Sequence, residues 1–152
     1  MQAIIFCGIQ ASGKSSFYKA HFFDTHVRIS QDLLRTHHRE RLFLQACLAT
    51  QMRYVVDKTN ATIEKRHLYM KQAKAAGYEV IGYFFDTDIK SALQRNSRRS
   101  GKAVIPERGI FGTLKKLQPP TLAEGFDQLY TVRLLPNEGQ FEVVPHLPQA
   151  NN

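Results

Sequence analysis

Short apolar runs alternate with longer segments of helical apolar spacing along most of the chain. Three of the runs are almost continuously apolar, which is typical of strands buried on both faces of a parallel sheet. Two further runs complete the expected set. The five expected strands are QAIIFC (2–7), VRIS (27–30), RYVVD (53–57), YEVIGYFFD (78–86) and QLYTVRLL (128–135).

The segments between these runs predict helices at residues 15–22, 39–52, 61–77, 88–99 and 107–117. Gly77 is a helix stop and Asp88 a helix start. In the second helix, the apolar residues have helical spacing. They are Leu42, Leu44, Cys47, Leu48 and Met52.

Alternating strands and helices predict βαβ units, a mainly parallel five-stranded sheet flanked by helices, and right-handed crossovers. The pattern contains no repeat or linker, so we expect one α/β domain over residues 1–135. The tail, residues 136–152, is rich in Pro and Asn at its end, although FEVV (141–144) has the composition of an added edge strand.

The composition is that of a soluble globular protein, with 43% hydrophobic and 22% charged residues among 152. No apolar run approaches the roughly 18 residues of a membrane span, and the first residues do not resemble a signal peptide. Two cysteines, Cys7 and Cys47, fit unpaired thiols in a reducing compartment. We therefore expect a cytoplasmic protein without a membrane or an obligate protein partner.

The net charge of +8 favours polyanionic partners. The basic side chains are concentrated in residues 88–116, where eight of them face two acidic ones, whereas residues 119–152 hold one arginine against four acids. A lid over a triphosphate and a groove for nucleic acid would both use such a segment.

The glycine-rich stretch GIQASGKS (8–15) fits the pattern G-x4-G-K-[ST] at every fixed position. Glycines let backbone N–H groups curl around phosphate oxygens, and the following helix points its positive end at the same anion. Lys14 would reach the β and γ phosphates, and the Ser15 hydroxyl would bind Mg²⁺. We expect ATP and Mg²⁺ as cofactors, with nucleotide contacts at Gly8, Gln10, Ala11, Ser12, Gly13, Lys14, Ser15 and Ser16.

Two aspartates follow expected strands, at the edge of the sheet where ligands of open α/β folds bind. Asp57 closes RYVVD and could support Ser15 and the metal's water shell; the alternative is a turn residue. Asp32 follows VRIS and could accept a proton from an attacking hydroxyl. Its alternative, shared with Ser30, is to cap the helix that begins at LLR.

Four arginines have a binding interpretation and a structural one. Arg35 lies three residues after Asp32, on the same face if the turn is helical, and could bind a substrate phosphate or lie on the solvated surface. Arg95, Arg98 and Arg99 end a helix before the loop SGKAVIP (100–106), where a lid could close over the triphosphate. Their alternative is to balance the helix dipole.

The order of GIQASGKSSF, ISQDLLR, VVDKTNATIEKR, FFDTD, QRNSRRSGKAVIP and PTLAEGF resembles the P-loop kinase domain of polynucleotide 5′-hydroxyl kinases, over about residues 3–134. The same D-x-x-R, D-x-T-N and arginine-lid set occurs in related AAA-type kinases whose acceptors vary. The resemblance implies a P-loop kinase fold with an arginine-bearing lid. It also implies transfer of the γ-phosphate of ATP to a 5′-OH end of DNA or RNA, as in nucleic acid repair.

The resemblance also implies residue roles. Lys14, Asp32 and Arg99 would be catalytic: Lys14 holds the donor, Asp32 is the general base and Arg99 is the lid arginine on the transferring phosphate. Arg95 would assist Arg99, and Ser15 and Asp57 would serve the metal. Arg35 would contact the acceptor's phosphate, with Thr59 and Asn60 lining the acceptor pocket.

Neither a D-x-D-x-T phosphatase motif nor a K-x-D-G ligase motif is present, so end-healing by this chain would be limited to the kinase step. Two alternatives stay open. One is a P-loop kinase for a small metabolite or nucleoside, and the other is an ATP-binding switch module without an external acceptor.

Overall fold

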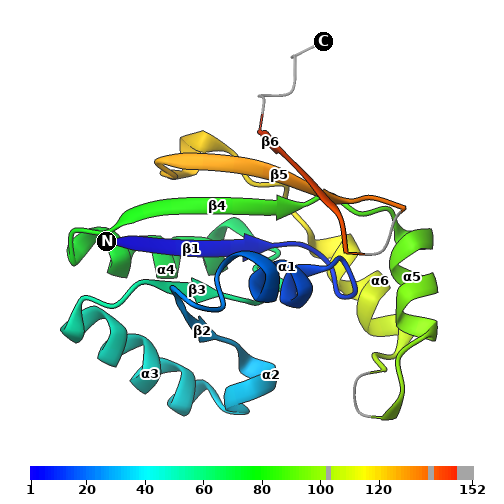
Figure 1. The fold of residues 1–152 in the computed structure, drawn as a ribbon, viewed down its shortest axis with the longest axis horizontal. Helices are drawn as coiled ribbons and strands as arrows, with labels where there is room; N and C mark the ends of the chain where they lie inside the picture. Colours follow the sequence, from blue (N-terminus) through cyan, green and yellow to red (C-terminus); the bar gives the residue numbers. More distant parts are fainter. Residues whose placement is uncertain (102–103, 137–138, 147–152) are drawn as a thin grey trace.

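A computed structural model describes residues 1–101, 104–136 and 139–146. Six strands and six α-helices follow one another mostly in alternation (Figure 1). The strands are β1 (Gln2–Cys7), β2 (Val27–Ile29), β3 (Tyr54–Val56), β4 (Glu79–Phe85), β5 (Gln128–Leu134) and β6 (Phe141–Pro145). The helices are α1 (Lys14–His21), α2 (Gln31–Leu34), α3 (His37–Thr50), α4 (Ile63–Ala75), α5 (Ile89–Ser97) and α6 (Glu107–Lys116).

The strands form one sheet in the order β2-β3-β1-β4-β5-β6. The five strands expected from the sequence are mutually parallel, which confirms the α/β architecture. The FEVV segment is a sixth strand, β6, which pairs antiparallel with β5. The carboxyl ends of the parallel strands therefore point to one edge, where α5 and α6 also lie (Figure 1).

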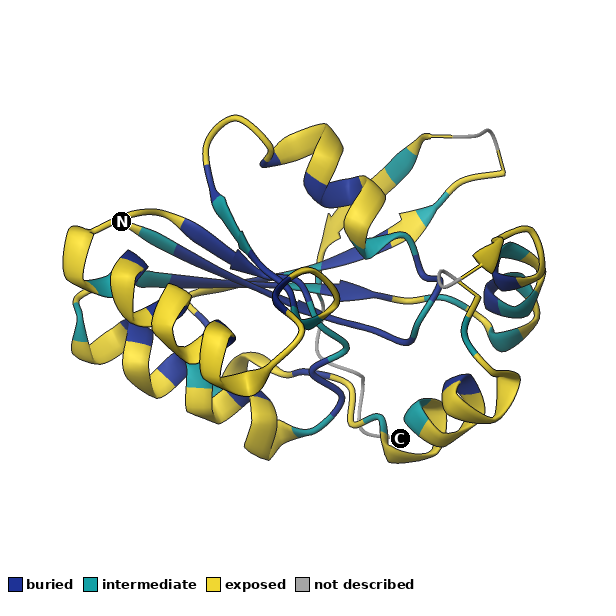
Figure 2. Cartoon of the chain, turned by 90° about the horizontal axis from the view of Figure 1, so that it is seen from below, coloured by how far each residue is buried: buried dark blue, intermediate teal, exposed yellow. Residues whose placement is uncertain are grey.

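Both faces of β1 are buried, which explains its continuous apolar run. Ala3 and Ile5 face a core shared with α3 and α4, whereas Ile4 and Phe6 face a second core shared with α1. Figure 2 shows the buried strands between helices whose outer faces are exposed. The second core is aromatic: the Phe6 and Phe85 ring centroids lie 4.9 Å apart, and the Phe17 ring packs 5.4 Å from Phe85.

The large apolar residues around α1 and α3 differ in burial. Phe17, Tyr18 and Phe22 are buried as core residues, but Phe23 in the same segment is 67% exposed. In α3, Leu44 and Cys47 are buried and Leu48 is half-buried, but Leu42 is 48% exposed, and Met52, after the end of the helix, is 46% exposed. Glu40 of α3 is buried, and Lys58 compensates its carboxylate at 3.2 Å.

A fully buried ion pair joins α4 to the short 3-10 turn Leu122–Glu124. Arg66 donates from Nε to Oε1 of Glu124 at 2.8 Å and from Nη2 to Oε2 at 3.0 Å. Its Nη1 donates to the Asn60 carbonyl at 2.9 Å and to Cys7 Sγ at 3.5 Å. The arginine is 0% exposed, so its charge depends on Glu124.

In the part of the chain that the structure describes, no helix is long and apolar enough to span a bilayer. The same residues contain no cluster of three or more His, Cys, Asp or Glu side chains that could hold a metal ion.

Replacing Glu124 by glutamine should destabilise the fold by about 3–5 kcal/mol, because the Arg66 guanidinium stays buried without a countercharge. The free energy of unfolding is measured by urea titration followed by circular dichroism. Asp86→Asn is the matched control, since Asp86 pairs with Arg133 at 3.2 Å in an exposed position and should cost about 0–1 kcal/mol. Equal losses of unfolding free energy in the two variants would contradict the role of Glu124 as the countercharge of buried Arg66.

Candidate active site

The glycine loop connects β1 to α1 at the carboxyl edge of the sheet. Gly13 has φ 96°, and a Cβ there would lie 3.2 Å from the Phe141 ring, so the position requires glycine. Gly8 requires glycine for space, because its Cβ would lie 2.8 Å from the Phe85 Cβ. Ala11 also adopts a left-handed conformation, with φ 59°. The loop therefore has the curled backbone that the motif predicts.

Lys14, the first residue of α1, folds over this loop. Its Nζ donates to the carbonyls of Ile9 at 2.6 Å and Gly8 at 3.0 Å, and to Ser12 Oγ at 3.4 Å. The pKa of Lys14 is lowered to about 8, mainly by burial and to a smaller extent by the nearby Arg99 guanidinium, while the carboxylates of Asp57 and Asp32 oppose the shift. The ammonium group thus sits among the site residues that the sequence predicts from three separate segments.

A cavity of about 410 Å³ opens beside the loop. It collects most of the predicted site residues: from the loop Gln10, Ala11, Gly13, Lys14, Ser15 and Ser16, and from other segments Asp32, Asp57, Thr59 and Arg99. Gln31, Lys58 and Ile105 also line it, and the sequence analysis did not select them. The predicted residues Gly8, Ser12, Arg35, Asn60 and Arg95 are not part of the lining.

Ser15 and Asp57 are in contact, as a pair that serves one metal ion would be. Ser15 Oγ donates to Asp57 Oδ2 at 3.2 Å. Arg28 of β2 completes this cluster: its Nε donates to the same carboxylate oxygen at 2.8 Å and its Nη2 to Ser15 Oγ at 3.0 Å. A hydroxyl and a carboxylate are hard oxygen ligands that suit Mg²⁺, which takes its remaining ligands from phosphates and water. The pair fits the predicted ion.

Asp32 lies exposed in the first turn of α2. Ser30 occupies the N-cap position of that helix, and neither side chain makes a capping hydrogen bond. The helix begins at Gln31, two residues earlier than LLR suggests, and its four residues place Asp32 in the cavity lining.

Arg35 does not share a helical face with Asp32, which corrects the sequence prediction. The helix ends at Leu34, and Arg35 follows with φ 76°; Arg35 is not part of the cavity lining. Asn60 is also misplaced by the prediction. It is 2% exposed, and its Nδ2 donates to the Phe6 carbonyl at 2.8 Å, which fixes the turn after β3 instead of the acceptor pocket.

Lys58 also lines the cavity, and its ammonium group is fixed by two side chains that are not part of the lining. Its Nζ lies 3.2 Å from both carboxylate oxygens of Glu40 and 3.0 Å from the Tyr69 hydroxyl. Tyr69 donates a short hydrogen bond to Glu40, and burial together with this carboxylate raises the pKa of Tyr69. Sequence spacing could not reveal this cluster, because its members come from three separate segments.

The arginine-bearing segment at the end of α5 contacts the glycine loop. Arg95 Nη1 donates to the Ala11 carbonyl at 2.6 Å, so Arg95 holds the loop's outer side. Asn96 exchanges two hydrogen bonds with the backbone of Ile105, at 2.6 and 2.9 Å, which ties the end of α5 to the residues just before α6. Arg99 follows α5 and lines the cavity. Lys102, part of the basic segment, lies outside the described residues.

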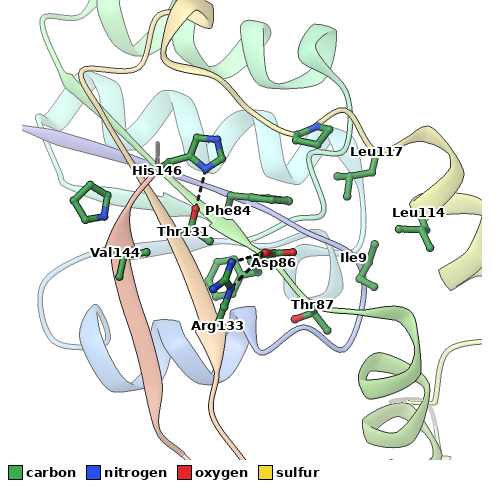
Figure 3. A pocket seen from close by; sticks show the side chains of 13 residues that line it. Ile9, Phe84, Asp86, Thr87, Leu114, Leu117, Thr131, Arg133, Val144 and His146 are labelled. Atoms are coloured by element: carbon green, nitrogen blue, oxygen red, sulfur yellow. Dashed lines mark hydrogen bonds and ion pairs between the residues drawn. The ribbon is translucent and has the colours of Figure 1, made fainter. Parts of the chain in front are cut away.

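A second cavity, of about 480 Å³, lies between α6 and the outer strands (Figure 3). Ile9 of the glycine loop forms part of its wall, but Lys14, Asp32 and Asp57 do not. Its mouth carries the exposed ion pair of Asp86 and Arg133. The candidate chemistry is therefore confined to the smaller cavity.

A sequence model of the family described as AAA domain matches residues 34–120, more than half of the chain. The bifunctional polynucleotide phosphatase/kinase of Schizosaccharomyces pombe is 24% identical over 135 residues, which cover 86% of this chain and 33% of that protein. The chain thus spans about a third of the length of this curated relative.

Two solved structures share the fold. A fungal RNA kinase is similar with a TM-score of 0.66 at 14% identity, covering 90% of this chain and 76% of its own. A gluconokinase from Sinorhizobium meliloti 1021 is similar with a TM-score of 0.63 at 19% identity, covering 87% and 82%. The chain has the α/β P-loop kinase fold, with a mostly parallel six-stranded sheet flanked by helices.

The lowered pKa of Lys14 predicts a pH-dependent affinity for ADP. Above about pH 8 the free protein loses the Lys14 proton, and a bound phosphate must recover it, so the dissociation constant should rise by up to about tenfold per pH unit. Calorimetric titration with ADP between about pH 7 and pH 9.5 measures this.

Lys14→Arg keeps its charge over this range and should flatten the profile. Lys19→Met, on the exposed side of the same helix, should leave it unchanged. A flat profile in the unaltered protein would show that Lys14 keeps its proton.

Proposed function

The chain belongs to the AAA domain family, and from this membership and the site geometry we propose that it is a polynucleotide 5′-hydroxyl kinase. It would transfer the γ-phosphate of ATP to a 5′-OH end of DNA or RNA in a Mg²⁺-dependent reaction. The observation that carries the proposal is that Lys14, Asp32 and Arg99, from three segments, line one cavity together with the Ser15–Asp57 pair.

On the donor side, the loop backbone and Lys14 would hold the triphosphate. Lys14 can exchange its hydrogen bonds to loop carbonyls for phosphate oxygens, which are stronger acceptors because they are charged. A Mg²⁺ ion held by Ser15 and supported by Asp57 would neutralise charge between the β and γ phosphates. Arg99 would place its guanidinium against the transferring phosphoryl group. Arg95 would keep the loop curled through its hydrogen bond to the Ala11 carbonyl.

On the acceptor side, Asp32 would take the proton of the attacking hydroxyl. Its exposed carboxylate on a short helix can be approached by the end of a chain. Thr59 and Lys58 line the same cavity and would orient the acceptor. Much of the acceleration in such a reaction comes from positioning and electrostatic stabilisation.

Two observations support a nucleic acid acceptor. The sequence similarity to a polynucleotide phosphatase/kinase extends over 86% of this chain, and the basic residues concentrate around the lid. Arg35 is not part of the cavity lining, which leaves the acceptor phosphate without its predicted partner there and favours the alternative, a kinase for a small metabolite or nucleoside.

Asp32→Asn should lower the rate of phosphoryl transfer by about 10²- to 10⁴-fold while ADP affinity stays within about twofold, because the amide cannot take the proton. Transfer is measured with γ-labelled ATP and a 5′-OH oligonucleotide. Asp24→Asn is the matched control, an exposed aspartate outside the cavity, and should retain full activity. Equal activity of the Asp32 variant would remove it from the role of base.

The same assay separates the acceptor classes. Label should enter a 5′-OH oligonucleotide and not one that already carries a 5′-phosphate. Transfer to small alcohols or nucleosides but not to oligonucleotides would establish the metabolite alternative. ATP binding with no transfer to any acceptor would indicate a switch module.

A further inference from the structure

Arg28 of β2 occupies a place that the glycine-loop motif does not anticipate. Its side chain is 24% exposed and reaches the pair of oxygens that we assign to the metal ion, Asp57 Oδ2 at 2.8 Å and Ser15 Oγ at 3.0 Å. Its guanidinium carbon also lies 5.8 Å from the centre of the Tyr18 ring, which is buried beneath it. Arg28 therefore has a fixed position rather than that of a solvated surface arginine.

The hydrogen bonds of the pair leave acceptor capacity for a metal ion. Ser15 donates its proton to Asp57, so its oxygen keeps two lone pairs, one of which accepts from Arg28. The contacts of Ser15 and Arg28 to Asp57 both use Oδ2. Ser15 and Asp57 line the cavity, whereas Arg28 does not, so an ion that enters the cavity can reach the pair where Arg28 does not form the wall.

The charges decide when the ion binds. The Asp57 side chain is 3% exposed, and Arg28 is its ion-pair partner. With Arg28 in contact, this carboxylate is already neutralised, and a divalent cation entering alone meets Arg28 and Lys14 as net repulsion. The negative phosphates of a nucleotide would offset the charges of Arg28 and Lys14, so that the divalent cation would bind together with the nucleotide.

We propose that Arg28 is a positioning residue that acts as the internal counter-ion of the Ser15–Asp57 pair: it keeps the pair assembled in the absence of a metal ion and makes divalent-cation binding dependent on the nucleotide. This rests on the part of the proposed function that places the ion at Ser15 and Asp57, and it does not depend on the acceptor.

The test measures Mn²⁺ affinity in the nucleotide-free protein by electron paramagnetic resonance. Arg28→Met and Arg28→Gln should each bind Mn²⁺ on the order of tenfold more tightly than the unaltered protein, because Asp57 loses its countercharge. Arg28→Lys keeps the charge and should stay close to the unaltered protein. Arg133→Met is the matched control, because it removes an arginine paired with an exposed aspartate, and should leave the Mn²⁺ affinity unchanged.

Adding Asp57→Asn to Arg28→Met should abolish the gain in Mn²⁺ affinity. The proposal is overturned if neither neutral variant binds Mn²⁺ more tightly, or if the gain survives the loss of the Asp57 carboxylate.

A second measurement uses the unaltered protein and does not depend on the variants folding. ADP should tighten Mn²⁺ binding by at least about tenfold, and equal affinity with and without ADP would also overturn the proposal.

These readouts need no acceptor, so they separate this inference from the assigned reaction. The expected Mn²⁺ behaviour without transfer to oligonucleotides would leave Arg28 in its role and change only the acceptor. Transfer to oligonucleotides with unchanged Mn²⁺ affinity in the variants would leave the kinase assignment and remove Arg28 from its role.

Discussion

The buried contact between Arg66 and Glu124 determines where the glycine loop begins. The same guanidinium donates to the Asn60 carbonyl, and the Asn60 side chain donates to Phe6 at the end of β1. The carbonyl of the preceding residue, Thr59, accepts from Gly8, the first residue of the loop, at 2.9 Å. Glu124 thus neutralises the arginine that fixes the turn against which the loop starts. PTLAEGF and D-x-T-N, two motifs that carry the family resemblance, meet in this one network and have a structural role in it.

Electrostatics explains why the site can stay assembled without a ligand. Lys14 and Arg28 are only partly exposed, and each has oxygen partners within the protein: loop carbonyls for Lys14, and the Asp57–Ser15 pair for Arg28. Burial disfavours the charged form of Lys14, and the carboxylates nearby limit that effect. The loop therefore holds these cations by contacts within the protein, and those of Lys14 can be exchanged for phosphate. This is preorganisation, since few groups must be newly ordered on binding.

The sequence predicts the donor side better than the acceptor side for a physical reason. The loop, Ser15 and Asp57 follow from strand ends and glycine spacing, and buried strands have strong apolar patterns. Arg28, Lys58 and Glu40 escaped prediction, because an isolated charged residue in a strand, loop or helix has no pattern that reveals a partner distant in sequence. Apolar spacing alone also cannot show that Leu42 is exposed while a compensated Glu40 in the same helix is buried. The prediction for Arg35 failed because α2 ends after one turn.

The contrast between the two sides bears on how acceptor specificity is encoded. The loop is held by β1, the turn after β3 and Arg95 of α5, so its geometry is shared with the whole core. The proposed acceptor side rests on α2, where only Leu34 is buried and Asp32 and Leu33 are exposed. A helix this short contributes little to stability, so its sequence can change at low cost to the fold. In the proposed reaction, the acceptor contacts would therefore lie where packing constrains the chain least, and a likeness of fold alone cannot distinguish an RNA end from a sugar.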